Sequence, residues 1–131
     1  MNTSKWDLGA RPYDLRERLL DFACLIVRVV EFLRTRGGTA AALSHQLLKA
    51  GTSAGANYEE ADDGSSPQDK AAKRKIVLRE LKETRFRLLV LQRSGFLSQE
   101  HQPVIAETTE LIRIVATIIR NDRRKQARAQ P

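Results

Sequence analysis

Apolar residues recur along the chain at intervals of three and four, a spacing that places them on one face of an α-helix. The first stripe covers residues 15–33 and consists of Leu15, Leu19, Phe22, Ile26, Val29 and Leu33. Gly37 and Gly38 follow this stripe and predict the end of the first helix. No stretch of the sequence shows the strict alternation of a half-buried strand, so the pattern predicts an all-α protein.

A second helix is predicted from Thr39, a residue type that caps helix N-termini, to a stop at Gly64. Its apolar stripe consists of Leu43, Leu47, Ala50, Ala54 and Tyr58. Because two of these five residues are alanine, this helix is expected to approach a neighbour closely.

The third helix has a strong start signal. Ser66 is the predicted N-cap, Pro67 occupies the first helical position, and Asp69 lies three residues after the cap. The apolar stripe consists of Ile76, Val77, Leu81, Thr84, Leu88 and Leu91. The helix is predicted to end at Gly95, with Phe96 folding back onto the preceding turn as in a Schellman-type cap.

Ser98 is the predicted start of the fourth helix, although Pro103 is expected to delay or kink its first turn. Its stripe consists of Ile105, Thr108, Leu111 or Ile112, Val115, and Ile118 or Ile119. Because short connections between long helices favour antiparallel neighbours, we expect an up-down-up-down four-helix bundle. This bundle is predicted as one domain over residues 1–131, with its core at about 13–120 and a basic tail at 121–131.

The segment KAGTSAGANYEEA, residues 49–61, contains two glycines four positions apart, Gly51 and Gly55. A phosphate-binding loop is disfavoured because it needs a preceding strand and a following Lys-Ser/Thr pair. A membrane-helix contact is disfavoured because the flanking residues are too polar for lipid. The interpretation that remains is a soluble helix with a thin face. Each interior glycine costs about 0.5–1 kcal/mol of helix stability, which tight packing must offset.

Residues 46–61 and 73–96 resemble the four-helix-bundle family first met as proteins encoded in intervening sequences of bacterial large-subunit ribosomal RNA genes. The residues that carry the resemblance are Ser53, Gly55, Ala56, Asn57, Glu60, Ala61, Lys75, Glu80, Glu83 and Thr84. The resemblance covers roughly residues 13–120. It implies an antiparallel bundle that assembles as a homopentameric ring with a central channel, and no established enzymatic activity.

A related group, the accessory proteins of diversity-generating retroelements, is similar in form, and its members are basic pentameric barrels that bind nucleic acid and a reverse transcriptase. The chain departs from the family pattern at Arg85-Phe86-Arg87, where the family often has an aromatic pair. Phe86 keeps one aromatic residue and Arg87 replaces the other, which makes the third helix more basic.

The formal net charge is +7, and the isoelectric point near 10.1 favours polyanionic partners. The residues predicted to contact phosphates lie on the third helix and the tail: Lys73, Arg74, Lys75, Arg79, Lys82, Arg85, Arg87, Arg123, Arg124 and Lys125. The alternative for the helix is a solvated face with salt bridges. The tail is expected to fray, as a cationic arm or as a solubilising tail. Without zinc-finger spacing or interleaved aromatics, binding is expected to be backbone-directed and weakly sequence-specific.

The second helix ends in an acidic cluster of four residues, Glu59, Glu60, Asp62 and Asp63. Their spacing fits no calcium loop, so we expect them to bind basic third helices within a subunit or across an interface. Glu60 is expected to pair with a buried or half-buried cation.

No metal, cofactor or catalytic residue is predicted. The carboxylate pairs on the third and fourth helices are not accompanied by the Glu-x-x-His motif of di-iron bundles. Cys24 lies among apolar residues and is interpreted as a core residue rather than a nucleophile. A single cysteine and the absence of a signal-peptide layout or a long apolar run favour a cytoplasmic protein.

The hypothesis from the sequence is therefore a non-enzymatic homo-oligomer, pentameric as the resemblance implies, that acts as a nucleic-acid-associated scaffold. RNA or DNA is the expected partner besides the protein itself. The residues expected to support folding and assembly are Gly51, Ser53, Gly55, Asn57, Tyr58, Glu60, Glu80 and Glu83. The alternative is an adaptor whose basic face binds an acidic protein such as a reverse transcriptase.

Overall fold

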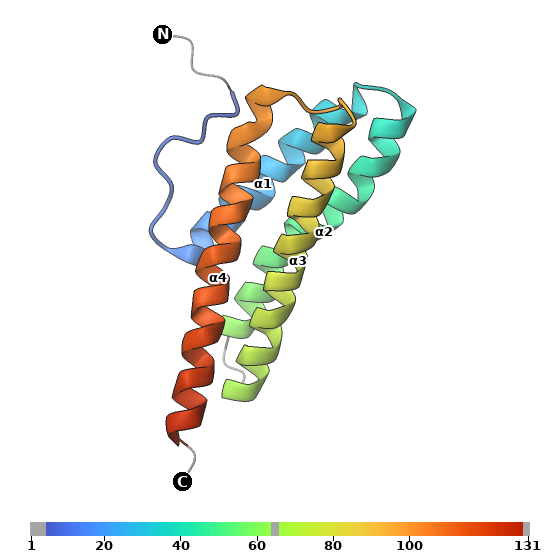
Figure 1. The fold of residues 1–131 in the computed structure, drawn as a ribbon. Coiled ribbons are helices and arrows are strands. Elements are labelled where there is room, and N and C mark those ends of the chain that lie inside the picture. The colour runs from blue at the N-terminus through green and yellow to red at the C-terminus, as the bar shows by residue number, and fades with distance from the viewer. Residues whose placement is uncertain (1–4, 64–65, 130–131) are drawn as a thin grey trace.

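The computed structural model describes residues 5–63 and 66–129, and four long helices account for most of them (Figure 1). The helices are α1 (Leu15–Arg34), α2 (Gly38–Asp62), α3 (Pro67–Arg93) and α4 (Gln102–Ala129), with a short 3₁₀ turn, η1 (Gln99–His101), before α4. Successive helices are joined by short connections and run antiparallel, so the predicted four-helix bundle is confirmed. None of the helices in the described part of the chain is long and apolar enough to cross a membrane.

Two of the predicted helix ends are confirmed. The Ser66 side chain accepts a hydrogen bond from the backbone N–H of Asp69, which caps α3. After α3, Gly95 adopts a φ of +84°, and the N–H of Phe96 bonds to the carbonyl of Leu91 at 2.9 Å, the Schellman arrangement.

The start of α2 differs from the prediction. Gly37, with a φ of +108°, is the N-cap, and α2 begins at Gly38 without a side-chain cap. Thr39 lies inside the first turn because the tight reversal after α1 needs a positive φ, which glycine adopts at little cost. The predicted stop at Gly64 lies outside the described residues.

The thin face of α2 packs against α1. A Cβ on Gly51 would lie only 2.7 Å from Cγ2 of Ile26, so the glycine is required by the close approach of the two helices. A Cβ on Gly55 would lie 3.5 Å from Leu19, which is an ordinary contact distance. The sequence therefore predicted the close approach correctly, and Gly51 rather than Gly55 is its tightest point.

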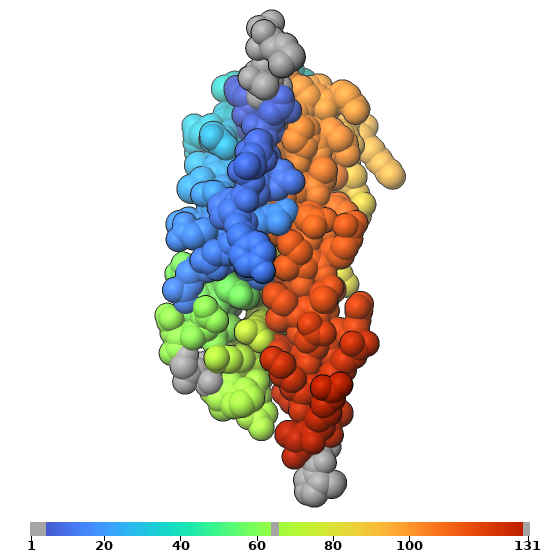
Figure 2. Space-filling model, turned by 90° about the vertical axis from the view of Figure 1, so that its left-hand side faces the viewer, coloured from blue at the N-terminus to red at the C-terminus, as the bar shows by residue number. Residues whose placement is uncertain are grey.

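The bundle is not closed on all sides, because α1 and α4 make few direct contacts. The segment before α1 lies along the groove between them, and we call residues 5–12 the strap (Figure 2). Trp6 is its anchor and is only 1% exposed, within the same apolar core as the helices. The prediction that the core begins at about residue 13 is therefore wrong, since one of the largest core side chains lies before it.

Two further predictions are corrected. Cys24 is exposed on α1, because the core-facing positions of that helix are taken by Phe22, Leu25 and Ile26 on either side of it. The tail was expected to fray, but it continues α4 as a helix as far as Ala129. Its arginine, lysine, glutamine and alanine residues have high helix propensity, and cations are favoured near a helix C-terminus.

Candidate functional site

The basic residues of α3 divide into paired and unpaired groups. Arg74 donates two hydrogen bonds to Asp122 of α4, at 2.8 and 2.9 Å, and both side chains are largely buried. The Lys73 ammonium lies 2.7 Å from the Glu60 carboxylate. Lys73 is therefore the half-buried cation that was expected to pair with Glu60. The Arg74 and Lys73 side chains thus join α3 to α4 and to α2, and their charge is partly neutralised inside the subunit.

Arg85 and Arg87 also have partners within the subunit. The Nε–H group of Arg85 donates to the Thr109 hydroxyl at 3.0 Å, and Arg87 lies 3.4 Å from Glu83 one turn earlier. Both contacts are at least partly exposed, so their contribution to stability is small, on the order of 0–1 kcal/mol each. A ligand phosphate could compete with them.

Lys75 and Lys82 are exposed and take part in no ion pair with the residues that the structure describes. They are seven positions apart and therefore share one stripe of α3. Arg79 is also exposed, with only a long 3.7 Å contact to Glu80. These three side chains, together with the exposed Arg93 at the end of the helix, are open to an external anion.

The tail of α4 continues this basic surface. Arg123, Arg124 and Lys125 are all exposed, and within residues 5–63 and 66–129 none of them forms an ion pair. A shallow hollow of about 300 Å³ between the start of α3 and the tail has Lys70 and Lys125 in its lining. A second hollow of about 310 Å³ along the same helix pair has Lys82 and Arg85 in its lining. We call the surface that carries these exposed cations the α3/α4 basic face: Lys75, Arg79, Lys82, Arg123, Arg124 and Lys125.

The residues expected to support assembly lie mostly between α2 and α3 of one subunit. The Ser53 hydroxyl is 3.1 Å from the Glu80 carboxylate and 3.2 Å from the Ala50 carbonyl, and Asn57 donates to the Ser53 carbonyl at 2.9 Å. Tyr58 is half-buried, and burial raises its pKa, with a further contribution from the Asp62 carboxylate. These contacts support the fold of the subunit itself.

The acidic cluster at the end of α2 contacts two different helices. Glu60 pairs with Lys73 of α3, as described above. Asp62 and Asp63 instead contact Arg16 of α1, at 3.2 and 3.5 Å. The expectation that the cluster binds basic third helices therefore holds for Glu60, whereas these two aspartates bind the first helix.

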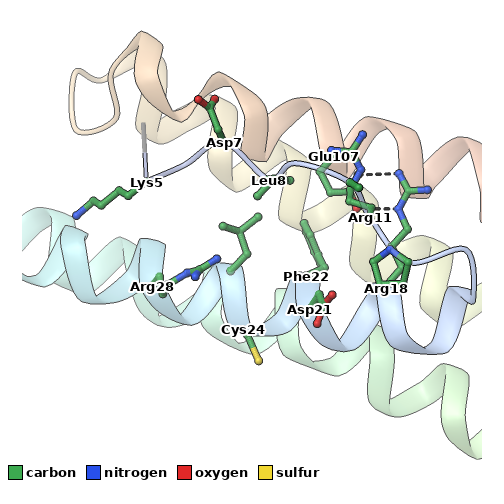
Figure 3. A pocket seen from close by; sticks show the side chains of 13 residues that line it. Lys5, Asp7, Leu8, Arg11, Arg18, Asp21, Phe22, Cys24, Arg28 and Glu107 are labelled. Atoms are coloured by element: carbon green, nitrogen blue, oxygen red, sulfur yellow. Dashed lines mark hydrogen bonds and ion pairs between the residues drawn. The ribbon is translucent and has the colours of Figure 1, made fainter. Parts of the chain in front are cut away.

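A polar site that was not predicted lies under the strap (Figure 3). The Glu107 side chain of α4 is only 3% exposed and accepts two 2.8 Å hydrogen bonds from the Nε–H and Nη2–H groups of Arg18. Arg11 of the strap adds a third contact, 3.0 Å from its Nε to Oε1. The hydrogen bond to Glu107 is the main cause that raises the pKa of Arg18. Glu107 thus joins α4, α1 and the strap.

A pocket of about 360 Å³ lies beside this ion pair, between the strap, α1 and the Glu107 position of α4. Its walls carry Lys5, Asp7, Asp21 and Arg28 as well as the Arg–Glu cluster. Figure 3 shows Cys24 pointing away from the strap, so the thiol is not aimed at the carboxylate. Both carboxylate oxygens of Glu107 are engaged by arginines, an arrangement suited to holding the strap in place.

The sequence carried a signal for this site. Position 107 lies three residues after Val104 and four before Leu111, both buried, and is therefore on the core-facing stripe of α4. A glutamate at such a position requires a cationic partner, because a buried unpaired charge is costly.

An aromatic cluster closes the other end of the strap. The His101 ring lies 4.8 Å from the rings of both Trp6 and Phe32, centroid to centroid. Its Nδ1 accepts the backbone N–H of Ser98 at 3.0 Å, and its buried Nε2 has no hydrogen-bond partner among the described residues. Burial is the main cause that lowers the pKa of His101. The neutral imidazole therefore suits this apolar site.

Within the described ranges, no group of three or more histidine, cysteine, aspartate or glutamate side chains is arranged to hold a metal ion. Two charged sites are present in the described residues: a basic surface on α3 and α4, and a neutralised ion-pair cluster under the strap. A small helical bundle with a basic face is the class of protein that this geometry defines.

Comparison with known proteins supports the helical bundle. The chain matches the family described as 23S rRNA-intervening sequence protein over residues 13–117, and it belongs to that family. It is similar to a crystal structure, at 1.70 Å resolution, of a protein with unknown function from the S23 ribosomal protein family of Bacteroides thetaiotaomicron. The two chains are 30% identical, with a TM-score of 0.74, and the match covers 81% of this chain and 98% of that one. No curated protein matches the chain.

Proposed function

We propose that the protein is a non-enzymatic homo-oligomer, a pentamer as the family resemblance implies, that binds nucleic-acid backbones through the α3/α4 basic face. The observation that carries this proposal is the set of exposed cations left without an internal partner among the described residues. They lie on neighbouring helices: Lys75, Lys82, Arg123, Arg124 and Lys125. Their number and arrangement suit phosphates, which each release counterions when neutralised.

The same arrangement determines the kind of recognition. The face presents ammonium and guanidinium groups on rigid helices but has few aromatic side chains for stacking bases. Binding is therefore directed to the backbone and weakly dependent on sequence. Repetition of the face in an oligomer would raise the overall affinity, since several weak contacts act on one polymer.

The test is fluorescence anisotropy with duplex DNA and structured RNA over a salt series, using nuclease-treated protein. For duplex DNA, each lost phosphate contact reduces the steepness of log K against log salt by about 0.9. Lys75→Gln/Lys82→Gln should therefore reduce that slope by about 2 per subunit engaged. The matched control, Arg28→Gln/Lys49→Gln, removes the same charge from exposed positions of α1 and α2 and should leave binding nearly unchanged.

Two outcomes would overturn the proposal. One is no binding of either nucleic acid at low salt. The other is an equal loss in the test and control variants, which would show a response to net charge alone. Saturable, nuclease-insensitive binding of an acidic protein through Lys75 and Lys82, without nucleic-acid binding, would instead establish an adaptor function.

A further inference from the structure

Helix α1 has a second apolar surface besides the one that faces the core. Leu20 is 50% exposed and Val27 is 42% exposed, and Cys24 lies exposed between them. Glu17 and Glu31 lie at the two ends, so the spacing is three, four, three and four residues, a heptad pattern. We call this stripe the α1 seam. A helix that is apolar on two sides is typically covered on both.

Helix α3 presents a stripe of the same length and the opposite charge. Phe86 is 62% exposed, and the half-buried Val90 lies one turn further on. Arg79 and Arg93 are each seven residues from Phe86 and form the two ends. We call this stripe the α3 seam. Both seams span fourteen positions between their terminal charges, about 21 Å at the helical rise.

The two seams cannot cover each other within one subunit, because α1 and α3 lie on opposite sides of the bundle (Figure 1). Of the four large hydrophobic side chains that are exposed in the described residues, three lie on these seams, and the fourth is Tyr13. Glu17 and Arg93 form no ion pair with any described residue. Glu31 and Arg79 have only long, exposed contacts of 3.6 and 3.7 Å, which are worth little.

A hollow next to the α1 seam fits the protruding aromatic residue of the α3 seam. It has a volume of about 210 Å³, lies between α1 and α2, and has Leu20, Ala23, Gly55 and Ala56 in its lining. Phe86 is the largest exposed side chain of α3 that lacks a partner surface. An aromatic side chain buried in such a hollow is a typical anchor of a protein interface.

We propose that the α3 seam of one copy of this chain docks on the α1 seam of the next, with Phe86 in the hollow between α1 and α2. The acidic ends of one seam then meet the basic ends of the other. Because different surfaces of the same chain are joined, the contact is heterologous, and it produces a ring when the rotation between neighbouring subunits closes. This inference rests on the self-association in the proposed function and assigns the surfaces that carry it.

The first test is the mass of the full chain in solution, by light scattering coupled to size exclusion. The wild type should have a mass that is a multiple of 14.8 kDa. Phe86→Ser and Leu20→Ser should each lower that mass toward 14.8 kDa. Their melting temperatures should fall only by the amount that assembly adds to the melting temperature of the subunit. Both side chains are at least half exposed in the subunit, so their loss should not disturb its core. Tyr13→Ser, which removes an exposed aromatic residue outside the seams, should leave the mass unchanged.

The second test reverses charges. Glu17→Arg/Glu31→Arg and Arg79→Glu/Arg93→Glu should each lower the mass, and the four changes combined in one chain should restore it in either orientation of the two seams. A mixture of the two reversed variants should form complexes heavier than 14.8 kDa, because each variant offers the other a complementary seam. A ring of five cannot alternate the two variants throughout, so it should form less completely than the ring of the wild type.

If Phe86→Ser and both charge reversals leave the mass of the oligomer unchanged, the two seams are not the interface, although the protein still self-associates. A monomeric wild type would overturn both. Lys82 lies on the α3 seam between Arg79 and Phe86, so nucleic-acid binding is judged separately with Lys75→Gln/Lys125→Gln, whose positions lie outside the seam.

Discussion

Replacement of the Glu107 carboxylate should be among the most destabilising single changes in the chain. In Glu107→Gln, Arg18 loses the counter-charge of a group that it contacts at 2.8 Å through two nitrogens, and Arg11 loses its 3.0 Å contact. Removal of one partner of a buried ion pair costs about 3–5 kcal/mol. The Arg18 and Arg11 side chains keep 15% and 41% of their exposure, so we expect the lower end, about 3 kcal/mol.

The free energy of unfolding is measured by urea denaturation followed by circular dichroism. At about 4 °C per kcal/mol for a domain of this size, the melting temperature should fall by about 12 °C. The double variant Arg18→Met/Glu107→Leu should recover most of the loss, because a well-packed apolar pair can replace a buried ion pair. A Glu107→Gln protein within about 0.5 kcal/mol of the wild type would refute the interpretation of Glu107 as the joint of α1, α4 and the strap.

Two further predictions concern α2 and the aromatic cluster. Gly51→Ala should destabilise the protein by about 1–3 kcal/mol, the cost of overpacking, because its Cβ would lie 2.7 Å from Ile26; urea denaturation measures this. The matched variant Gly55→Ala should be neutral or stabilising by up to about 1 kcal/mol, since its Cβ has ordinary contacts. The lowered pKa of His101 means that the folded state favours the neutral ring. Its contribution is therefore fully present above the ordinary histidine pKa of about 6.5 and is lost as the pH falls through the lower folded value.

Each of these has an outcome that contradicts it. Equal effects of alanine at Gly51 and Gly55 would contradict the difference in helix separation. For His101, the unfolding free energy is compared between pH 8 and pH 5.5 in the wild type and in His101→Phe. The loss on acidification should be smaller in the variant, whereas the exposed His45→Gln control should behave like the wild type. The charges near the ring are Lys5 and Arg36, which oppose protonation, and Glu100, which favours it.

The fold followed from the sequence because its signals were local. The apolar stripes, the Ser66 cap and the Gly95 end depend on residues within one or two turns of each other, and these determine helices and their connections. The thin face at Gly51 was also readable, since a glycine inside a helix has a cost that only close packing explains. Which helix approached it, α1 through Ile26, depended on tertiary structure.

The strap and the pairing of charges could not be read in the same way. Trp6 lies in a segment without periodicity, and its burial depends on a groove that exists only when α1 and α4 are in place. Arg74 and Lys75 are adjacent in a basic run, yet Arg74 faces Asp122, 48 positions away, whereas Lys75 faces solvent. Composition counts both as cations available to a ligand. Only the packing of α3 against α4 distinguishes them.

The strap also implies an order of events when the protein is made. Its partners on α4 are synthesised late: Glu107 follows Arg18 by 89 positions, and Arg11 is earlier still. Protein synthesis proceeds at about 5–20 residues per second, so the strap leaves the ribosome several seconds before α4 can form. During that time Trp6 has no groove in which to be buried. The loop closed by this contact is among the longest in the chain, and its entropy must be overcome after the local helices have formed. The strap is thus the earliest of the described segments to be made and among the last to fold.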